Sequence, residues 1–251
     1  MKTCVIIPAR TKSRRIPNKP LLKVNDKEFL LLRTFKKIIK DFPKSDVYIA
    51  TDSKKVAQAM EKYTKKTILI KKNCLNGSER SSLALRKIRI KYDYCIITSC
   101  DMPFLNGKIL NVLIKKTKLK KNFDGITVHS KIINKNVLKN KSIAKILLKK
   151  DRIINFTRSK ILINRKNVFT HHGLVLLKRK ILLKYSELKN TPLQLKEDNE
   201  WLKLIENGYK IYSYPNKFIK PEINTKVDLK KYFPLKFKYL KNIKKLEYFK
   251  K

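Results

Sequence analysis

The chain has 251 residues, 42% of them hydrophobic, and 63 basic against 19 acidic side chains give it a formal net charge of +44. This length and apolar content exclude a disordered chain and predict one large folded domain. The basic residues are spread along the whole chain, so the charge predicts no specific nucleic-acid partner, only weak binding to RNA at low salt.

Targeting signals and metal-binding cysteines are not indicated. The N-terminus leads directly into an apolar stretch and no apolar run approaches membrane-spanning length, so we expect a cytoplasmic protein without a transmembrane segment. Cys4, Cys74, Cys95 and Cys100 form no Cys-x-x-Cys pair. We expect them to be buried free thiols, as in a reducing compartment.

The first predicted strand, residues 4–7, opens onto a basic loop between two prolines. Its cations are Arg10, Lys12, Arg14, Arg15 and Lys19. Proline stiffens the backbone, and arginine and lysine are the side chains that bind phosphate oxygens. The loop is therefore a candidate phosphate-binding loop; the alternative is an ordinary solvated basic loop.

The next segments alternate between helix and strand. Apolar spacing predicts helices over 28–40 and 54–63 and strands over 46–52 and 67–70. This βαβαβ order predicts a parallel sheet with ligands beyond the carboxyl ends of its strands. The basic loop and Thr51-Asp52 both fall at that edge.

Two polar turns follow. Residues 76–80 open a predicted helix over 81–90, with Ser78 as its N-cap; unpaired donors at such a turn could also read a pyrimidine edge. A buried strand over 94–98 then ends before Asp101, which Pro103 follows. A carboxylate in this place suits a magnesium ion bound to phosphates, and the alternative is an Asx turn.

The later elements are less regular. We expect a helix over 106–119, strands over 124–129, 142–149 and 168–177, a loop over 134–141, a helix over 193–207 and a short strand near 208–211. His171 lies on an apolar strand, which is more typical of a core histidine than of a ligand. Glu197 and Glu200 are expected to share a helix face, as sugar-hydroxyl acceptors or as first-turn acids that complement the helix dipole.

Several motifs together resemble a known family. The pattern Pro-Ala-Arg-x-x-Ser-x-Arg-x-Pro-x-Lys-Pro-Leu over 8–21 resembles the nucleotide-binding loop of the 3-deoxy-manno-octulosonate (Kdo) cytidylyltransferase family. The resemblance extends over residues 5–229. Its further motifs are Gly77-Ser78-Glu79-Arg80, Asp101-Met102-Pro103, Phe156-Thr157-Arg158-Ser159, His171-His172-Gly173 and the stretch 223–229.

The resemblance implies a fold. It is a three-layer α/β/α, nucleotide-diphospho-sugar-transferase-like (Rossmann-like) fold with a mostly parallel sheet and an inserted β segment. Residues 1–229 would form a single domain, in which the insertion, about 130–190, supplies the sugar pocket and a homodimer contact. Residues 230–251 would be a basic, aromatic C-terminal extension that packs on the domain or, alternatively, contacts a membrane surface or RNA.

The resemblance also implies an activity: Kdo and CTP would give CMP-Kdo and pyrophosphate for lipopolysaccharide synthesis, with Mg²⁺ as cofactor. The catalytic residues would be Arg10, Lys19 and Asp101. The nucleotide-binding residues would be Ala9, Arg10, Ser13, Arg15, Lys19, Asn76, Gly77, Ser78 and Arg80. The sugar-binding residues would be Arg158, His171, Glu197 and Glu200. The metal ligands would be Asp101 and Asn224.

The chain departs from the family pattern at several of these positions. Asn18 stands for a glycine, Ser99 and Cys100 for Gln-Gly, Val175 and Leu177 for tyrosines, and Asn224 for an aspartate. An asparagine oxygen can bind magnesium but brings no charge, so we expect weaker metal binding. Two alternatives remain open: a cytidylyltransferase for another acidic sugar (amino-Kdo or a nonulosonic acid), and a catalytically silent, basic nucleic-acid-binding relative.

Overall fold

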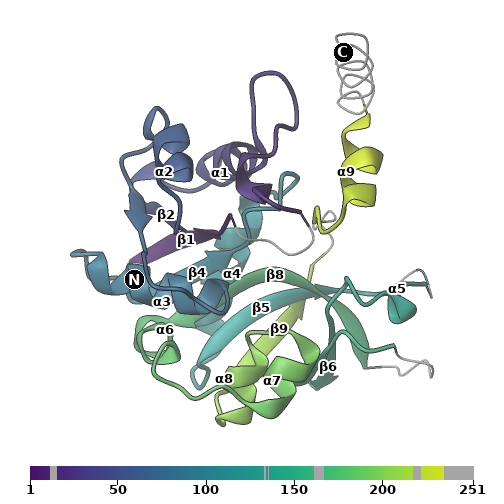
Figure 1. The fold of residues 1–251 in the computed structure, drawn as a ribbon. Coiled ribbons are helices and arrows are strands. Elements are labelled where there is room, and N and C mark those ends of the chain that lie inside the picture. The colour runs from purple at the N-terminus through teal and green to yellow at the C-terminus, as the bar shows by residue number, and fades with distance from the viewer. Residues whose placement is uncertain (12–15, 133, 135, 161–166, 217–221, 235–251) are drawn as a thin grey trace.

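A computed structural model describes residues 1–11, 16–132, 134, 136–160, 167–216 and 222–234 (Figure 1). In that view the N-terminal strands lie on the left and the later strands at the lower right. The two parts share one sheet, and each is described in turn.

The first part alternates strands and helices. In chain order its elements are β1 (Thr3–Ala9), η1 (Lys19–Leu21), α1 (Leu30–Ile39), η2 (Lys44–Asp46), β2 (Val47–Thr51), α2 (Lys54–Glu61), β3 (Thr67–Leu69), α3 (Gly77–Lys87), β4 (Tyr94–Thr98) and α4 (Lys108–Leu119). β1 pairs in parallel with β2 and β4, and β2 with β3. The predicted parallel βαβαβ unit is confirmed; we call it the parallel half.

Both faces of the parallel half are covered because its strands are apolar on both sides. On β1, Cys4 and Ile6 pack towards α3, whereas Val5 and Ile7 pack towards α1, α2 and α4. This arrangement makes the three layers expected of this part of the chain. All four cysteines are buried and free, as predicted.

The second part is dominated by strands. Its elements are β5 (Gly125–Ser130), α5 (Asn136–Lys139), β6 (Lys145–Lys149), β7 (Arg152–Thr157), β8 (Val168–Lys178), α6 (Arg179–Tyr185), α7 (Pro192–Glu197), α8 (Leu202–Glu206), β9 (Ile211–Pro215) and α9 (Lys226–Tyr232). Figure 1 shows α7 and α8 beside these strands. We call strands β5 to β9 the barrel half.

The sheet is not mostly parallel, and this prediction was wrong. The described strands follow the order β3-β2-β1-β4-β8-β5-β9-β7-β6, and β8 also pairs with β6, which closes β8, β5, β9, β7 and β6 into a barrel. β8 has 11 residues: residues 174–178 pair with β4, and residues 168–170 pair antiparallel with β6. One long strand therefore joins the open sheet to the barrel.

Three local predictions also need correction. Asn76, not Ser78, caps α3, and its side chain accepts a hydrogen bond from the Glu79 amide at 2.9 Å. The loop expected over 134–141 contains the short helix α5. The helix expected over 193–207 is two helices, because Asp198 has a left-handed backbone (φ 45°) that ends α7.

α9 continues past the boundary expected at residue 229. Leu229 and Phe233 pack in a cluster with Ile16, Val24 and Leu30, and the Phe233 ring stacks on Phe104 at 5.5 Å. The start of the expected extension is thus part of the fold, while residues 235–251 lie outside the described residues. Within the described part of the chain, no helix is long and apolar enough to cross a membrane.

Candidate active site

The carboxyl ends of β1 and β4 bring a cation and a carboxylate together. Lys19, from η1, forms an ion pair through Nζ with Oδ2 of Asp101, which follows β4. The two side chains are only 10% and 8% exposed. The loop after the first strand and Asp101 therefore meet at one edge of the sheet, where parallel strands place ligands.

The backbone before Lys19 explains its position. Asn18 is left-handed (φ 52°), and its amide donates to the Thr11 carbonyl at 3.0 Å. Asparagine tolerates this conformation better than most residues, so it replaces the family's glycine without breaking the turn. Pro20 then fixes the start of η1.

The start of α3 lies against the same edge. The Arg10 guanidinium donates to the Leu75 carbonyl at 3.2 Å, just before α3. A Cβ on Gly77 would lie 3.0 Å from Cγ of the Pro8 ring, so the close packing of this ring on the helix start favours glycine. Ala9 is the last residue of β1 and is fully buried behind this contact.

A carboxylate already occupies the amino end of α3. The Ser78 amide donates to Glu200 Oε2 at 2.8 Å. Burial raises the pKa of Glu200, although the Ser78 hydrogen bond opposes the shift. Asn76 is also engaged, since its amide nitrogen donates to the Tyr185 hydroxyl at 3.1 Å. Glu200 therefore lies at the same edge as the predicted nucleotide-binding residues, and its predicted contact with the sugar stays a prediction.

Arg80 lies behind the edge. Its guanidinium is buried and donates to Asp52 Oδ2 at 3.2 Å and to the Ile70 carbonyl at 3.4 Å. Asp52 in turn accepts from the Thr11 amide at 3.3 Å. Arg80 therefore supports the start of the basic loop through Asp52, and its predicted nucleotide contact stays a prediction.

Asp101 has a neighbour that the sequence analysis missed. Glu222 Oε1 accepts from the Gly173 amide at 2.5 Å, and Glu222 Oε2 accepts from the Asn224 amide nitrogen at 3.3 Å. Burial, and then the Asp101 charge, raise the pKa of Glu222. A carboxylate two residues before Asn224, in a chain poor in acids, was the signal available in the sequence.

One atom of Asp101 is left without a partner. Asp101 Oδ1 is buried and accepts no hydrogen bond from the described residues, an arrangement that costs free energy unless a cation or donor binds there. The described residues contain no group of three His, Cys, Asp or Glu side chains able to hold a metal. Magnesium needs no such cage, because it binds one or two carboxylates together with substrate phosphates. The residues at Asp101 therefore fit Mg²⁺.

The remaining sugar-site candidates lie in the barrel half. His171 is buried between Phe156 and Trp201, and its Nε2 lies 3.1 Å from the Thr127 hydroxyl. Burial holds the pKa of His171 well below its usual value, so the ring is neutral. His171 is therefore a core residue with a satisfied hydrogen bond.

Glu197 and the Arg158 side chain are both hydrogen-bonded to neighbouring parts of the protein. Glu197 accepts four hydrogen bonds, from the Thr157 hydroxyl, the Arg158 amide and the Ser159 amide and hydroxyl. Although burial opposes it, these bonds lower the pKa of Glu197. The Arg158 side chain donates to the carbonyls of Asp198 and Ser142.

The prediction that Glu197 and Glu200 share a face was wrong. Asp198 interrupts the helix between them, so Glu197 turns into the barrel half and Glu200 to the start of α3. Glu197 is consequently a structural anchor for the end of β7.

Comparison with known proteins agrees with the family resemblance of the sequence motifs. The family model described as cytidylyltransferase matches residues 4–249. The chain belongs to the cytidylyltransferase family. It is therefore a nucleotidyltransferase, as the motifs predicted.

Within the cytidylyltransferase family the chain has named relatives. It is 33% identical to the 3-deoxy-manno-octulosonate cytidylyltransferase of Fusobacterium nucleatum, over 84% of this chain and 87% of the relative. It is 29% identical to the enzyme of the same name from Protochlamydia amoebophila, over 82% and 83% of the two chains. Among solved structures, CMP:2-keto-3-deoxy-manno-octonic acid synthetase complexed with CTP matches with a TM-score of 0.83 and 23% identity, covering 95% of this chain and 100% of the other. The last likeness supports the fold.

Two positions at which the chain departs from the family pattern lie in the core, away from the Asp101 edge. Val175 and Leu177, which stand where the family has tyrosines, are 1% and 0% exposed and belong to the core. The predicted ligands Ser13 and Arg15 lie outside the described residues. Among the described residues, the candidate site of this cytidylyltransferase therefore consists of the Lys19–Asp101 pair, Arg10, the start of α3, Glu200, Glu222 and Asn224.

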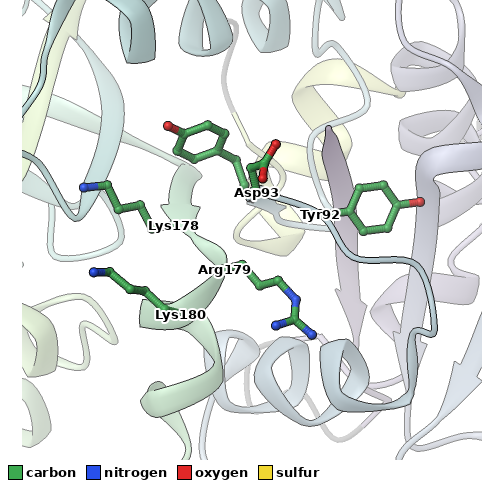
Figure 2. A pocket seen from close by; sticks show the side chains of 6 residues that line it. Tyr92, Asp93, Lys178, Arg179 and Lys180 are labelled. Carbon is green, nitrogen blue, oxygen red and sulfur yellow. The ribbon is translucent and has the colours of Figure 1, made fainter. Parts of the chain in front are cut away.

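A pocket lies at the opposite edge of the sheet from Asp101 (Figure 2). It is a pocket of about 340 Å³ lined by Tyr92, Asp93, Tyr94, Lys178, Arg179 and Lys180. Tyr94 begins β4, whereas Asp101 follows its end, so the pocket contains none of the predicted site residues. We assign the chemistry to the Asp101 edge because the family motifs meet there.

Proposed function

We propose that this cytidylyltransferase activates Kdo with CTP. The anomeric hydroxyl oxygen of the sugar bonds to the α-phosphorus of CTP, the bond from that phosphorus to the bridging oxygen breaks, and pyrophosphate leaves. The hydroxyl proton passes to solvent. The products are CMP-Kdo and pyrophosphate, and the names of the two relatives support this choice of substrates.

The observation that carries the proposal is the buried Lys19–Asp101 pair beside Arg10 and the start of α3. In-line phosphoryl transfer leaves little covalent chemistry to the protein, so positioning and charge neutralisation must supply the rate. Lys19 and Arg10 would hold the triphosphate in the orientation for attack. The turn at Gly77 and Ser78 would lie against the cytosine.

Asp101 and Asn224 would hold Mg²⁺, and the buried Asp101 Oδ1, which accepts no hydrogen bond from the described residues, supports this role. When bound, the ion would neutralise the phosphates and the developing charge on the leaving group. Lys19 already neutralises Asp101 at its other oxygen, so one carboxylate can serve both the lysine and the ion.

The sugar would bind next to Glu200 and contact its carboxylate. Glu200 is partly exposed and contacts the start of α3. His171, Glu197 and Arg158 are engaged by the protein and would shape the neighbouring wall without direct contact. This reassigns the predicted sugar ligands to one direct contact and three supporting residues.

We further propose that the enzyme acts in the cytoplasm, for lipopolysaccharide synthesis, as a homodimer. Sedimentation would test the dimer. The suggested membrane contact of the C-terminal tail falls outside the described residues, and vesicle flotation of the full chain would test it.

The assay is pyrophosphate release by the full chain at moderate salt. CTP is compared with UTP, and Kdo with amino-Kdo and a nonulosonic acid. We expect turnover with CTP and Kdo, and at least about 100-fold less with UTP because a site built to bind one pyrimidine edge leaves polar groups unpaired with the other. Preferred turnover of another acid would transfer the proposal to that sugar. Silence with every sugar, together with salt-sensitive RNA binding, would contradict it.

A further inference from the structure

The segment before α9 delivers a carboxylate to Asp101. The Ile223 amide donates to the Asp101 carbonyl at 3.0 Å, which fixes the two segments side by side. Glu222 then reaches the Gly173 amide, and a Cβ at Gly173 would lie only 2.7 Å from Glu222 Oε1. Gly173 is thus required for Glu222 to sit where it does.

The charges of this cluster do not balance. Asp101 and Glu222 bring two carboxylates, and Lys19 brings one buried ammonium. Asp101 is 6% exposed and its Oδ1 has no partner among the described residues. Two close carboxylates with one free buried oxygen attract a small cation that accepts oxygen ligands.

Asn224 does not supply the missing charge. Its amide nitrogen donates to Glu222 Oε2, and its backbone amide donates to Asp228 Oδ2 at 2.9 Å. Thr225 and Asp228 form a capping box at the start of α9, which anchors this turn. Asn224 is therefore oriented to hold the Glu222 carboxylate in place.

We propose that Glu222 supplies the second carboxylate of the divalent-cation site, beside Asp101, in place of the aspartate that the family has at position 224. This inference rests on the proposed function for its metal. The negative charge has moved two residues along the chain. Asn224 positions it through its amide nitrogen, while its side-chain oxygen keeps the ligand role proposed above.

Direct titration of Mn²⁺, followed by the electron paramagnetic resonance signal of the free ion, tests the proposal with and without CTP. Glu222→Gln keeps an acceptor for the Gly173 amide but removes the charge. We expect it to weaken Mn²⁺ binding about tenfold or more, and Asn224→Asp to strengthen it at least about threefold. The double variant Glu222→Gln with Asn224→Asp should return close to the wild-type affinity.

The control is Glu61→Gln, which removes one carboxylate from the exposed surface of α2, where Glu61 pairs only with Lys65 among the described contacts. It should leave Mn²⁺ binding unchanged. Unchanged Mn²⁺ affinity in Glu222→Gln, or no binding by the wild type, would overturn the proposal. If Glu222→Gln melts early, the double variant decides: an Mn²⁺ affinity equal to that of Asn224→Asp alone would overturn the proposal.

The same proteins separate this inference from the proposed function. Loss of Mn²⁺ binding in Glu222→Gln, in a wild type that turns over no sugar, would leave the cation site standing and remove the function. If the wild type turns over Kdo and Glu222→Gln binds Mn²⁺ as the wild type does, the proposed function stands and the Glu222 ligand is wrong.

Discussion

The parallel half and the barrel half use their charged residues differently. At the carboxyl edge of the parallel half, Lys19, Asp101 and Glu222 gather, and the buried Asp101 Oδ1 has no hydrogen-bond partner in the part of the chain that the structure describes. In the barrel half, Glu197 and Arg158 turn inward and bind backbone amides and carbonyls. Similar residue types would therefore serve chemistry in one half and folding in the other.

The largest expected effect comes from Asp101→Ala. It removes the candidate metal ligand and the partner of Lys19, so pyrophosphate release should fall by about 10³-fold or more. The matched control is Asp93→Ala, at the other end of β4, where the carboxylate accepts from the Lys2 amide. Near-normal turnover by the Asp101 variant, or equal losses in both, would erase the distinction between the two edges.

Lys19→Met should come next. It removes a candidate triphosphate cation and leaves Asp101 buried without its ion-pair partner, so turnover should fall about 100-fold. Breaking a buried pair also lowers stability by about 3–5 kcal/mol. Added Mg²⁺ should raise the melting temperature of this variant more than that of the wild type; the opposite order would show that Asp101 binds no cation.

Arg10→Ala should have a smaller effect because Arg10 is exposed and contacts the Leu75 carbonyl. We expect the KM for CTP to rise about tenfold while kcat changes little, as for the loss of one charge-assisted phosphate contact. Steady-state kinetics at two salt concentrations would measure it. A fall in kcat with an unchanged KM would assign Arg10 to the transition state instead.

Glu197→Gln, in the barrel half, should lower stability and leave turnover nearly unchanged. Turnover at pH 7 should stay within about threefold, while the free energy of unfolding falls by about 3 kcal/mol, because hydrogen bonds to a buried carboxylate are lost. The folded-state pKa of Glu197 is lowered from its ordinary 4.5, so its stabilisation is complete above that pH and is lost as pH falls through the folded value. Denaturant unfolding should show the difference between the two proteins shrinking on acidification. A large loss of kcat would return Glu197 to the sugar site.

His172 should affect stability alone, and only in acid. Its ring lies 2.9 Å from the Ser130 hydroxyl, and burial lowers its pKa from 6.5 to about 4. The unfolded chain then binds the proton between these values, so stability should fall as pH drops below 6.5, by up to about 1.4 kcal/mol per pH unit. His172→Gln should flatten this slope in unfolding measurements between pH 7 and 5, and an unchanged slope would contradict the assignment.

The sequence predicted the parallel half and its edge well. Alternation of apolar segments is a local signal, and parallel strands bring their carboxyl ends together, so the meeting of Lys19 and Asp101 could be expected. The closure of the barrel could not, because it depends on β8 pairing with both β4 and β6, which no local period encodes.

The wrong prediction for Glu197 and Glu200 and the omission of Glu222 also have tertiary causes. The left-handed turn at Asp198 broke an otherwise helical pattern and separated Glu197 from Glu200. Glu222 lies in a segment without periodicity, and its approach to Asp101 depends on a tertiary contact at Gly173. Motif resemblance predicted the candidate site, but only the side-chain contacts show which of its residues are already bonded to the rest of the protein.

The most direct test is a crystal of the full chain soaked with CTP and Mn²⁺, examined by anomalous diffraction. We expect a manganese peak beside Asp101 Oδ1 and the triphosphate between Lys19 and the start of α3. A nucleotide in the pocket between Tyr92 and Lys180, or manganese bound away from Asp101, would contradict the assignment of catalysis to the carboxyl edge.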